Sequence, residues 1–396
     1  MKEENKSTVY NALIYIISCC LNGKKVDKEL LSHTTLDSIY SAASNHSLIA
    51  IVATALEGAG VVSKRAAEMK LNAIRKNMLF DSARAEILAE LEKNKIKYLP
   101  LKGVIMKELY PSVGLRQMSD NDILFDKDYR SQVRDIMLSL GYDNKLYEMC
   151  NQDVYIKEPV LNFEMHVSLF DHPALPLFND YFSAAFDRAV PDGKGLYGHA
   201  MTDEDFYIFM KAHEYKHYAN SGTGLRSLVD VYVYLTAKKD SLNLDYITSE
   251  CKKLEISEYE KLTREIALKV FEPETAEALV MADRGEGESP LSDYDAGFLQ
   301  DYINASTYGS HETYLSNILT REKKTRNTSG ASAKMRYILN LAFPKMEYYE
   351  TVCPGVSKKK YLIPFLWIKR SVIILIKRPG RTLKTIWEVV RAKVKK

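Results

Sequence analysis

Residues 116–125 read Arg-Gln-Met-Ser-Asp-Asn-Asp-Ile-Leu-Phe, which places two carboxylates, Asp120 and Asp122, directly before an apolar run. The run Ile123–Phe125 predicts a β-strand, on which residues i and i+2 point to the same face. Two carboxylates on one face repel each other unless a cation lies between them. Because Mg²⁺ binds one or two carboxylates together with water and substrate phosphates, the pair indicates half of a phosphoryl-transfer metal site.

Two flanking segments extend this pattern. Upstream, Lys97–Gly103 is an apolar strand that ends in Lys102-Gly103. A glycine there lets the backbone approach a phosphate closely, and a lysine supplies a positive charge. Downstream, Asn162–Phe170 alternates between apolar and polar residues, which predicts a half-buried strand. Glu164 lies on the polar face of that strand and adds a third carboxylate.

These segments together resemble the nucleotidyltransferases of the DNA polymerase beta superfamily. The similarity is greatest to a bacterial branch with the pattern LKG…R…D-x-D…E-x-H. The residues that carry it are Lys102-Gly103, Leu115-Arg116, Ser119–Leu124, Leu140-Gly141-Tyr142 and Glu164-Met165-His166. Further matches at His213…Lys216-His217, Arg226…Asp230, Phe343-Pro344 and Leu362–Arg370 extend the resemblance over residues 65 to 378.

The resemblance implies that Asp120, Asp122 and Glu164 form the catalytic set and hold two Mg²⁺ ions, with Mn²⁺ as an alternative. Glu164 would bridge a metal or take the proton from the acceptor hydroxyl. The donor would be an NTP, with ATP as the first candidate. The acceptor, whether a small molecule, a peptide, a protein or an RNA, is not identified by the sequence. The residues implied in nucleotide binding are Lys102, Gly103, Arg116, Ser119, His166, His213, Lys216 and His217.

One departure concerns the phosphate-binding loop. The commoner superfamily motif has Gly-Ser or Gly-Gly before the acid pair, with a shorter gap. Here Lys102-Gly103 precedes the acids with a long gap. This fits the bacterial branch, but it leaves open which groups hold the phosphates.

Each of these signals, taken alone, also fits an ordinary structural role. Ser119–Asp122 has the composition of a turn. Lys102 either ends a strand in solvent or contacts phosphate, and Arg116 either pairs with a surface acid or clamps the triphosphate. His166 contacts substrate, orients Glu164, or is a structural histidine on a polar face. The combination of three strand segments, rather than any one of them, indicates a metal-dependent transferase.

His213-Glu-Tyr-Lys-His217 matches H-E-x-x-H, in which two histidines on one helix face bind zinc and the glutamate acts as the base. A zinc hydrolase is therefore an alternative function. Lys216 would put a cation beside the zinc, and no third ligand follows in a recognisable frame, which weighs against it. The preferred interpretation is a cationic helix face that touches phosphates or the acceptor. Arg226 and Asp230, four residues apart, fit a helical salt bridge.

The order of patterns along the chain predicts an α+β fold with a small mixed-sheet, polymerase-beta-like core and helical flanks. Residues 8–93 show helical spacing, and the pattern is helical again from residue 203. Between them we expect strands at 97–101 and 120–126, helices at 104–110 and 128–140, and further strands between 142 and 170. The predicted domains are a helical region (1–94), the nucleotidyltransferase core (95–200), a helical domain (201–345) and a basic amphipathic tail (346–396).

Composition limits the class of protein. With 396 residues, 46% hydrophobic and 27% charged, the chain is typical of a folded soluble protein of two or more domains. Five cysteines without a C-x-x-C pair favour reduced thiols and a cytoplasmic location. The apolar stretch Val9–Leu21 lacks a small-residue cleavage site, which favours a core helix over a signal peptide. A catalytically silent nucleotide-binding or scaffold protein on the same fold is a further alternative.

The net charge of +3 hides an asymmetry. Residues 357–396 hold 13 Lys or Arg and one acid, a local charge of +12, so the other 356 residues carry the remaining −9. Three interpretations of this basic tail stay open. It lies on an anionic membrane surface, as a peripheral protein at the inner membrane would; it packs on the body of the protein as an amphipathic helix; or it binds nucleic acid.

Overall fold

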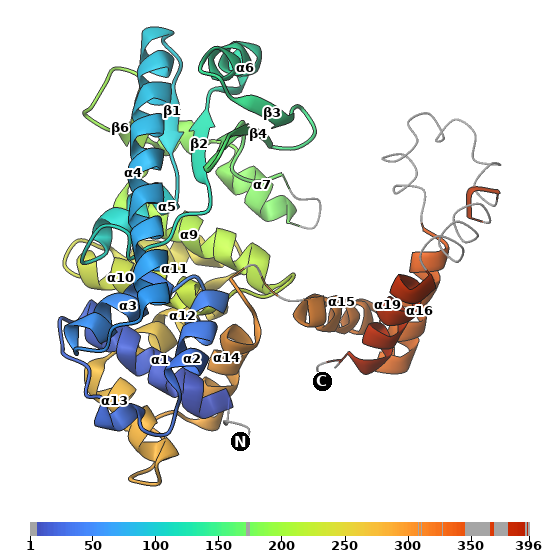
Figure 1. Cartoon of the computed structure of the whole chain (residues 1–396). Helices are drawn as coiled ribbons and strands as arrows, with labels where there is room; N and C mark the ends of the chain where they lie inside the picture. Colours follow the sequence, from blue (N-terminus) through green and yellow to red (C-terminus); the bar gives the residue numbers. More distant parts are fainter. Residues whose placement is uncertain are drawn as a thin grey trace. The chain divides into compact units, whose positions relative to one another are not determined.

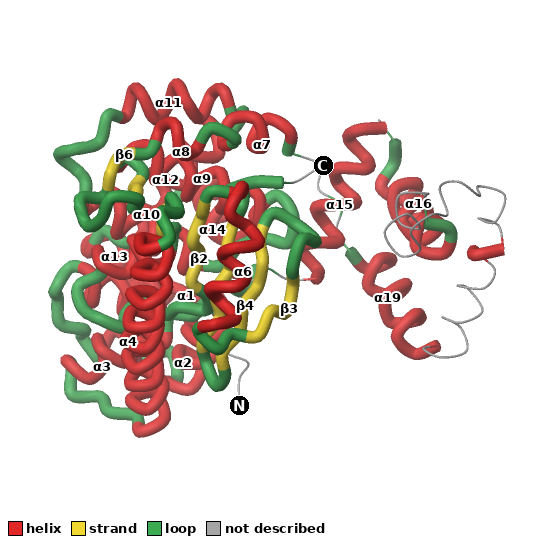
Figure 2. Tube along the Cα trace, turned by 90° about the horizontal axis from the view of Figure 1, so that it is seen from above, coloured by secondary structure: helices red, strands yellow, loops and turns green. Residues whose placement is uncertain are grey.

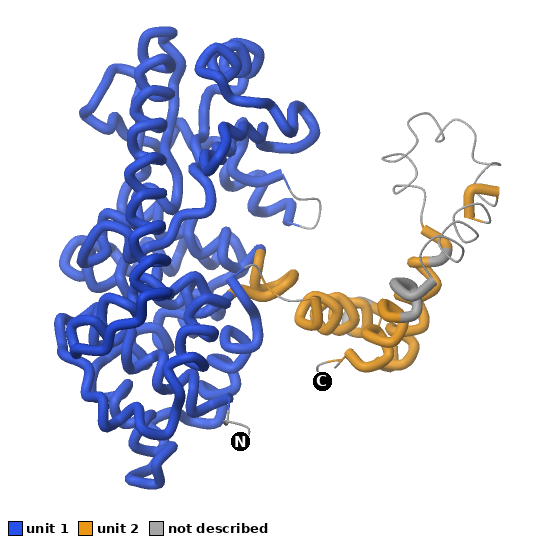
Figure 3. The backbone as a smooth tube through the Cα atoms, viewed as in Figure 1, with its two compact units in different colours: residues 1–216, 224–307 blue, residues 217–223, 308–396 orange. Residues whose placement is uncertain are grey.

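The computed structural model describes residues 6–171, 175–307, 309, 311–326, 328–344, 365–367, 379–392 and 394 (Figure 1). The chain divides into two compact units (Figure 3). The first comprises residues 1–216 and 224–307, and the second comprises residues 217–223 and 308–396. The first unit holds the sheet and all the acidic residues that the sequence singles out.

A five-stranded mixed sheet forms the centre of the first unit. Its strands are β1 (Tyr98–Pro100), β2 (Asn121–Phe125), β3 (Asp143–Leu146), β4 (Gln152–Lys157) and β5 (Leu161–His166). The order across the sheet is β1-β2-β5-β4-β3. β2 and β5 are parallel, and the other neighbouring pairs are antiparallel. The sheet and its helical flanks confirm the predicted α+β class.

Helices α4 (Lys64–Lys93) and α6 (Arg130–Ser139) cover one face of this sheet, where Figure 2 shows them beside the strands. Ile123 of β2 and Met165 of β5 point into the apolar core beneath the two helices. Because side chains alternate along a strand, Asp122 and Glu164 point to the opposite face. Asp122, Glu164 and His166 are therefore gathered on one side of the sheet.

Short elements join the strands and follow them. They are α5 (Gly103–Met106), η2 (Lys107–Leu109), η3 (Lys127–Tyr129), α7 (Pro176–Phe182), α8 (Ala185–Arg188) and the two-stranded β6 (Val190–Pro191) and β7 (His199–Ala200). Gly141 ends α6 with a φ of +79°, the conformation that glycine adopts most readily. This is the helix stop that Leu140-Gly141-Tyr142 predicts.

The helices before and after the sheet pack on each other. Those before it are α1 (Lys6–Leu21), η1 (Glu29–Leu31), α2 (Leu36–Asn45) and α3 (Ile49–Gly58). Those after it are α9 (Asp203–Tyr218), α10 (Leu225–Ala237), α11 (Leu244–Lys253), α12 (Ser257–Val270), α13 (Pro273–Asp283) and α14 (Asp293–Asn304). Helix α1 packs against α13, and the Ser18 hydroxyl donates to the Phe271 carbonyl at 2.8 Å. The expected divisions near residues 94 and 200 therefore lie within one compact unit.

A buried ion pair ties the loop before β2 to helix α10. Arg116 donates from Nε and Nη2 to the two carboxylate oxygens of Asp230, at 2.8 and 2.9 Å. The Tyr110 hydroxyl donates to the same carboxylate at 2.7 Å. Arg226, which the sequence predicts to pair with Asp230 along the helix, helps to lower the pKa of Asp230. The residue that donates two hydrogen bonds to the Asp230 carboxylate, however, is Arg116. This pair fixes the segment that leads into Asp120 and Asp122.

The second unit is helical where it is described. α15 (His311–Arg326), α16 (Gly330–Ala342) and α19 (Pro379–Arg391) pack around Leu315, Leu319, Ala333, Val389 and Ala392. One face of α19 is thus used in packing, while Trp387 on the same helix is exposed. Most of the basic tail lies outside the described residues, so its three interpretations stay predictions. None of the helices within the described ranges is both long and apolar enough to span a bilayer.

We predict that Asp230→Ala lowers the free energy of unfolding by about 3–5 kcal/mol, because it leaves the buried Arg116 charge without a partner. Urea denaturation of the full chain measures this loss. The matched control is Glu274→Ala, which breaks an exposed pair with Lys24 and should lower the stability far less. Equal effects of the two substitutions would contradict the structural importance of the buried pair.

Candidate active site

Asp122, Glu164 and His166 form a cluster on the polar face of the sheet. His166 Nε2 lies 3.1 Å from Asp122 Oδ1 and 3.8 Å from Glu164 Oε2. One ligand atom from each of the three residues lies within 4.8 Å of the others. Asp122 and His166 are buried, and Glu164 is half-buried. The donor set of two carboxylates and one imidazole fits a divalent metal ion.

The register of two parallel strands produces this cluster. Asp122 of β2 is directly opposite Glu164 of β5, and Leu124 is opposite His166. Residues 164 and 166 share a face because they are two apart on one strand. Gln152 on the neighbouring strand β4 donates from Nε2 to Glu164 Oε2 at 2.6 Å, which orients that carboxylate.

The two carboxylates of the cluster differ strongly in acidity. Burial works to raise the pKa of Asp122, but the positive charge of Lys102 and the hydrogen bond from His166 outweigh it and hold the pKa well below its usual range. Burial, followed by the negative charges of Asp122 and Asp120, raises the pKa of Glu164 to about 7. One carboxylate is therefore ionised near neutral pH while the other can hold or release a proton.

Lys102, at the end of β1, brings a cation to the same site. Its Nζ lies 3.6 Å from Asp122 Oδ2 and 2.7 Å from Nε2 of His213 on α9. Its backbone has φ +40°, a conformation that side-chain-bearing residues rarely adopt. Such strain persists where the surroundings hold it, and here it lies at the point where β1 meets α5.

Helix α9 contributes a second cation. Burial, and then the charge of Lys102, lowers the pKa of Lys216 to about 8, while Asp122 and Glu164 act in the opposite direction. Lys216 therefore lies within electrostatic reach of both carboxylates. The structure thus brings together Asp122, Glu164, His166, Lys102, His213 and Lys216 from the residues that the sequence singles out.

Asp120 lies just before β2 and outside the three-residue cluster. Its charge nevertheless acts on Glu164, whose pKa it helps to raise. It also acts on Lys76 of α4, whose Nζ donates to the Ser119 carbonyl at 3.2 Å. The sequence analysis missed Lys76 and Gln152. Neither has a motif around it, because each reaches the site only through tertiary packing.

Gly103 and Arg116 have structural partners in this fold. A Cβ added at Gly103 would meet the end of the Met118 side chain at 2.7 Å and Arg116 Nη1 at 2.8 Å. The space beside Gly103 is therefore filled by the chain itself, and the Arg116 guanidinium is committed to Asp230. Nucleotide contacts from Gly103, Arg116 and Ser119 stay predictions.

The H-E-x-x-H segment does not form a zinc-hydrolase site in the described residues. Glu214, the base that such an enzyme needs, is buried and accepts from Lys211 at 2.5 Å and from the Tyr302 hydroxyl at 2.7 Å. The three-residue metal cluster found in the described ranges contains neither His213 nor His217. His213 instead lies beside Lys102, and His217 belongs to the second unit.

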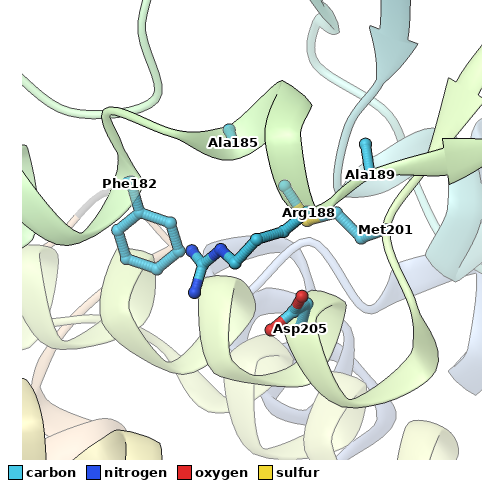
Figure 4. A pocket seen from close by; sticks show the side chains of 6 residues that line it. All are labelled: Phe182, Ala185, Arg188, Ala189, Met201 and Asp205. Atoms are coloured by element: carbon cyan, nitrogen blue, oxygen red, sulfur yellow. The ribbon is translucent and has the colours of Figure 1, made fainter.

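A small pocket lies elsewhere in the first unit, among α7, α8 and the start of α9 (Figure 4). Its lining includes Arg188, whose guanidinium stacks 4.2 Å from the Tyr181 ring centroid. None of its lining residues belongs to the acidic cluster. The pocket therefore plays no part in the chemistry considered below.

Comparison with known proteins agrees with this geometry. A family described as "uncharacterised nucleotidyltransferase" matches residues 32–272, which include the whole sheet and the acidic cluster. No curated protein and no solved structure matches the chain.

We predict that Glu164→Gln stabilises the metal-free protein above neutral pH. In the wild type, the unfolded chain ionises Glu164 near pH 4.5 but the folded chain does so only near pH 7, so stability falls between these values and then levels off. The variant avoids this loss, which amounts to up to about 3 kcal/mol. Urea unfolding in chelator measures the difference, which should vanish near pH 4.5. A difference that is constant with pH would refute the explanation.

Proposed function

The chain belongs to the family of uncharacterised nucleotidyltransferases, and on this premise we propose that it transfers a nucleoside monophosphate from an NTP to an acceptor hydroxyl. The acceptor oxygen forms a bond to the α-phosphorus, the bond to the β-phosphate oxygen breaks, and pyrophosphate leaves. The single observation that carries the proposal is the cluster of Asp122, Glu164 and His166 on neighbouring parallel strands.

The residues of the site fit divalent ions, with Mg²⁺ as the expected species and Asp120 as an additional ligand. Asp122 supplies an ionised carboxylate at neutral pH, since its pKa is held low. Divalent ions at these carboxylates would offset the charge on the phosphates and align the attacking and leaving oxygens. The acidic residues alone would repel a triphosphate, so the reaction depends on such ions or on the nearby lysines.

Glu164 is our candidate for the general base. A general base works best when its pKa is near the working pH, and in the metal-free site burial beside two aspartates moves the pKa of Glu164 to about 7. Gln152 holds its Oε2 in a fixed direction. The proton of the acceptor hydroxyl would pass to Glu164 as the oxygen attacks the α-phosphorus.

Lys102, His213 and Lys216 form the cationic side of the site. Lys102 Nζ lies 3.6 Å from Asp122 Oδ2. A lysine binds phosphate as a point charge and can follow it as the leaving pyrophosphate gains charge. We propose that these three residues bind the β- and γ-phosphates of the NTP, ATP being the first candidate.

A catalytically silent NTP-binding protein on the same fold is the second candidate. Calorimetry with NTP, with and without Mg²⁺, tests binding, whereas incubation with each α-labelled NTP, Mg²⁺ and cell lysate tests transfer. Metal-dependent binding without any labelled product would favour the silent protein. The identity of the labelled molecule would define the acceptor class.

We predict that Asp122→Ala lowers the rate of label transfer by on the order of 1,000-fold, since the loss of a metal ligand removes several kcal/mol of charge stabilisation. Asp120→Ala and Glu164→Ala should also be severely impaired. The matched control is Asp143→Asn on β3, whose side chain is 76% exposed and pairs only with the exposed Lys145 among the interactions observed. Transfer at the wild-type rate by the Asp122 variant would overturn the assignment.

We also predict that Lys216→Met weakens NTP binding by about 10- to 100-fold, because it removes a charged hydrogen-bond donor to the phosphates. Titration calorimetry measures the affinity. Lys239→Met, at an exposed position beyond the end of α10, is the control and should bind NTP as the wild type does. An unchanged affinity in the Lys216 variant would remove this residue from the phosphate site.

A further inference from the structure

We propose that His166 is itself a metal ligand, alongside Asp122 and Glu164, and that it makes the site prefer Mn²⁺ to Mg²⁺. This inference rests on one part of the proposed function, namely that the cluster binds a divalent ion. It differs from the nucleotide contact expected for His166 from the sequence. It also assigns the site a preference for a transition-metal ion, whereas a set of carboxylates alone suits Mg²⁺ equally well.

The distances suit three neighbouring positions around one ion. A metal holds its nitrogen and oxygen ligands at about 2.0–2.2 Å, so adjacent ligands of an octahedral ion are about 3 Å apart. His166 Nε2 is 3.1 Å from Asp122 Oδ1 and 3.8 Å from Glu164 Oε2. Small side-chain rotations would place all three atoms on one face of an octahedron, which leaves the opposite face for phosphate oxygens and water.

The hydrogen bonding of His166 leaves its metal-binding nitrogen available. The ring is only 5% exposed, yet its Nδ1 has no hydrogen-bond partner within the structure as described. Nε2 lies 3.1 Å from Asp122 Oδ1 and donates to that carboxylate in the tautomer that has the proton on Nε2. Nothing holds the ring in that tautomer through Nδ1. The proton can therefore move to Nδ1 and free the Nε2 lone pair without breaking any bond at Nδ1.

The chemistry of the ligands sets the preference. Mg²⁺ binds oxygen ligands almost exclusively, whereas imidazole nitrogen suits transition metals. Mn²⁺ accepts carboxylates and imidazole in one octahedral site. A metal-bound histidine usually donates its other N–H to a carboxylate or carbonyl, which strengthens the ligand. His166 has no such partner in the described structure, so we expect a site that exchanges its ion readily rather than one that traps it.

A purely orienting role for His166 makes different predictions. In that case the imidazole would hold Asp122 through the 3.1 Å hydrogen bond and would stay off the ion. His166→Gln distinguishes the two roles, because its amide group reaches the position of Nε2 and can still donate an N–H to Asp122, but the imidazole nitrogen is removed. An orienting residue replaced in this way would change the affinities for Mn²⁺ and Mg²⁺ by similar factors.

The test uses the full chain with Mn²⁺ or Mg²⁺ alone, without NTP. Electron spin-echo envelope modulation of bound Mn²⁺ should show a nitrogen coupling that changes when histidine is labelled with ¹⁵N and disappears in His166→Gln. Calorimetry should show Mn²⁺ affinity falling at least about tenfold in that variant, with Mg²⁺ affinity nearly unchanged. His33→Gln, at an exposed position, is the control and should keep both the coupling and the affinities.

Mn²⁺ bound without nitrogen coupling, equal losses for both metals, or no binding of Mn²⁺ would each overturn the proposal. These outcomes separate it from the proposed function. Label transfer with Mg²⁺ but no nitrogen coupling would refute the role of His166 and leave the transferase intact. A nitrogen coupling without label transfer would support the metal ligand and argue against the transfer reaction.

Discussion

The parallel pairing of β2 with β5 is the constraint on which the site depends. It places Asp122 directly opposite Glu164, so that a buried and a half-buried carboxylate share one face of the sheet. Like charges in a partly buried setting cannot both ionise freely, and the protein resolves the conflict by separating their acidities. Lys102 and His166 stabilise the charge on Asp122, while Glu164 keeps its proton up to about neutral pH.

The rest of the first unit holds this arrangement in place. The apolar face of the sheet is covered by α4 and α6, so the two strands cannot slip without exposing core residues such as Phe163. The Arg116–Asp230 pair fixes the loop that enters β2. On the polar face, the contact between Lys102 and His213 links the end of β1 to α9. Packing on one face thus positions the chemistry on the other.

The sequence predicts those parts of the site that local pattern encodes. Alternation along Asn162–Phe170 correctly puts Glu164 and His166 on a polar face, and the apolar run after Asp122 correctly predicts β2. What it could not predict is set by distant contacts. Nothing near Arg116 in the sequence indicates that its partner is Asp230. The motif H-E-x-x-H likewise does not show that Glu214 is buried and hydrogen-bonded to Lys211 and Tyr302. No recognisable sequence motif surrounds Lys76 or Gln152.

The position of Lys102 lowers the electrostatic cost of gathering these carboxylates in one cluster. Its ammonium lies 3.6 Å from Asp122 and so offsets part of the charge that a divalent ion would otherwise neutralise. Since Lys102 also contacts His213, an ion that displaced it from Asp122 would leave it directed towards α9, where Lys216 already lies. Two ammonium groups brought together there would repel each other unless an anion joined them. The same electrostatics would therefore couple ion binding at the acids to the triphosphate binding that we propose at the lysines.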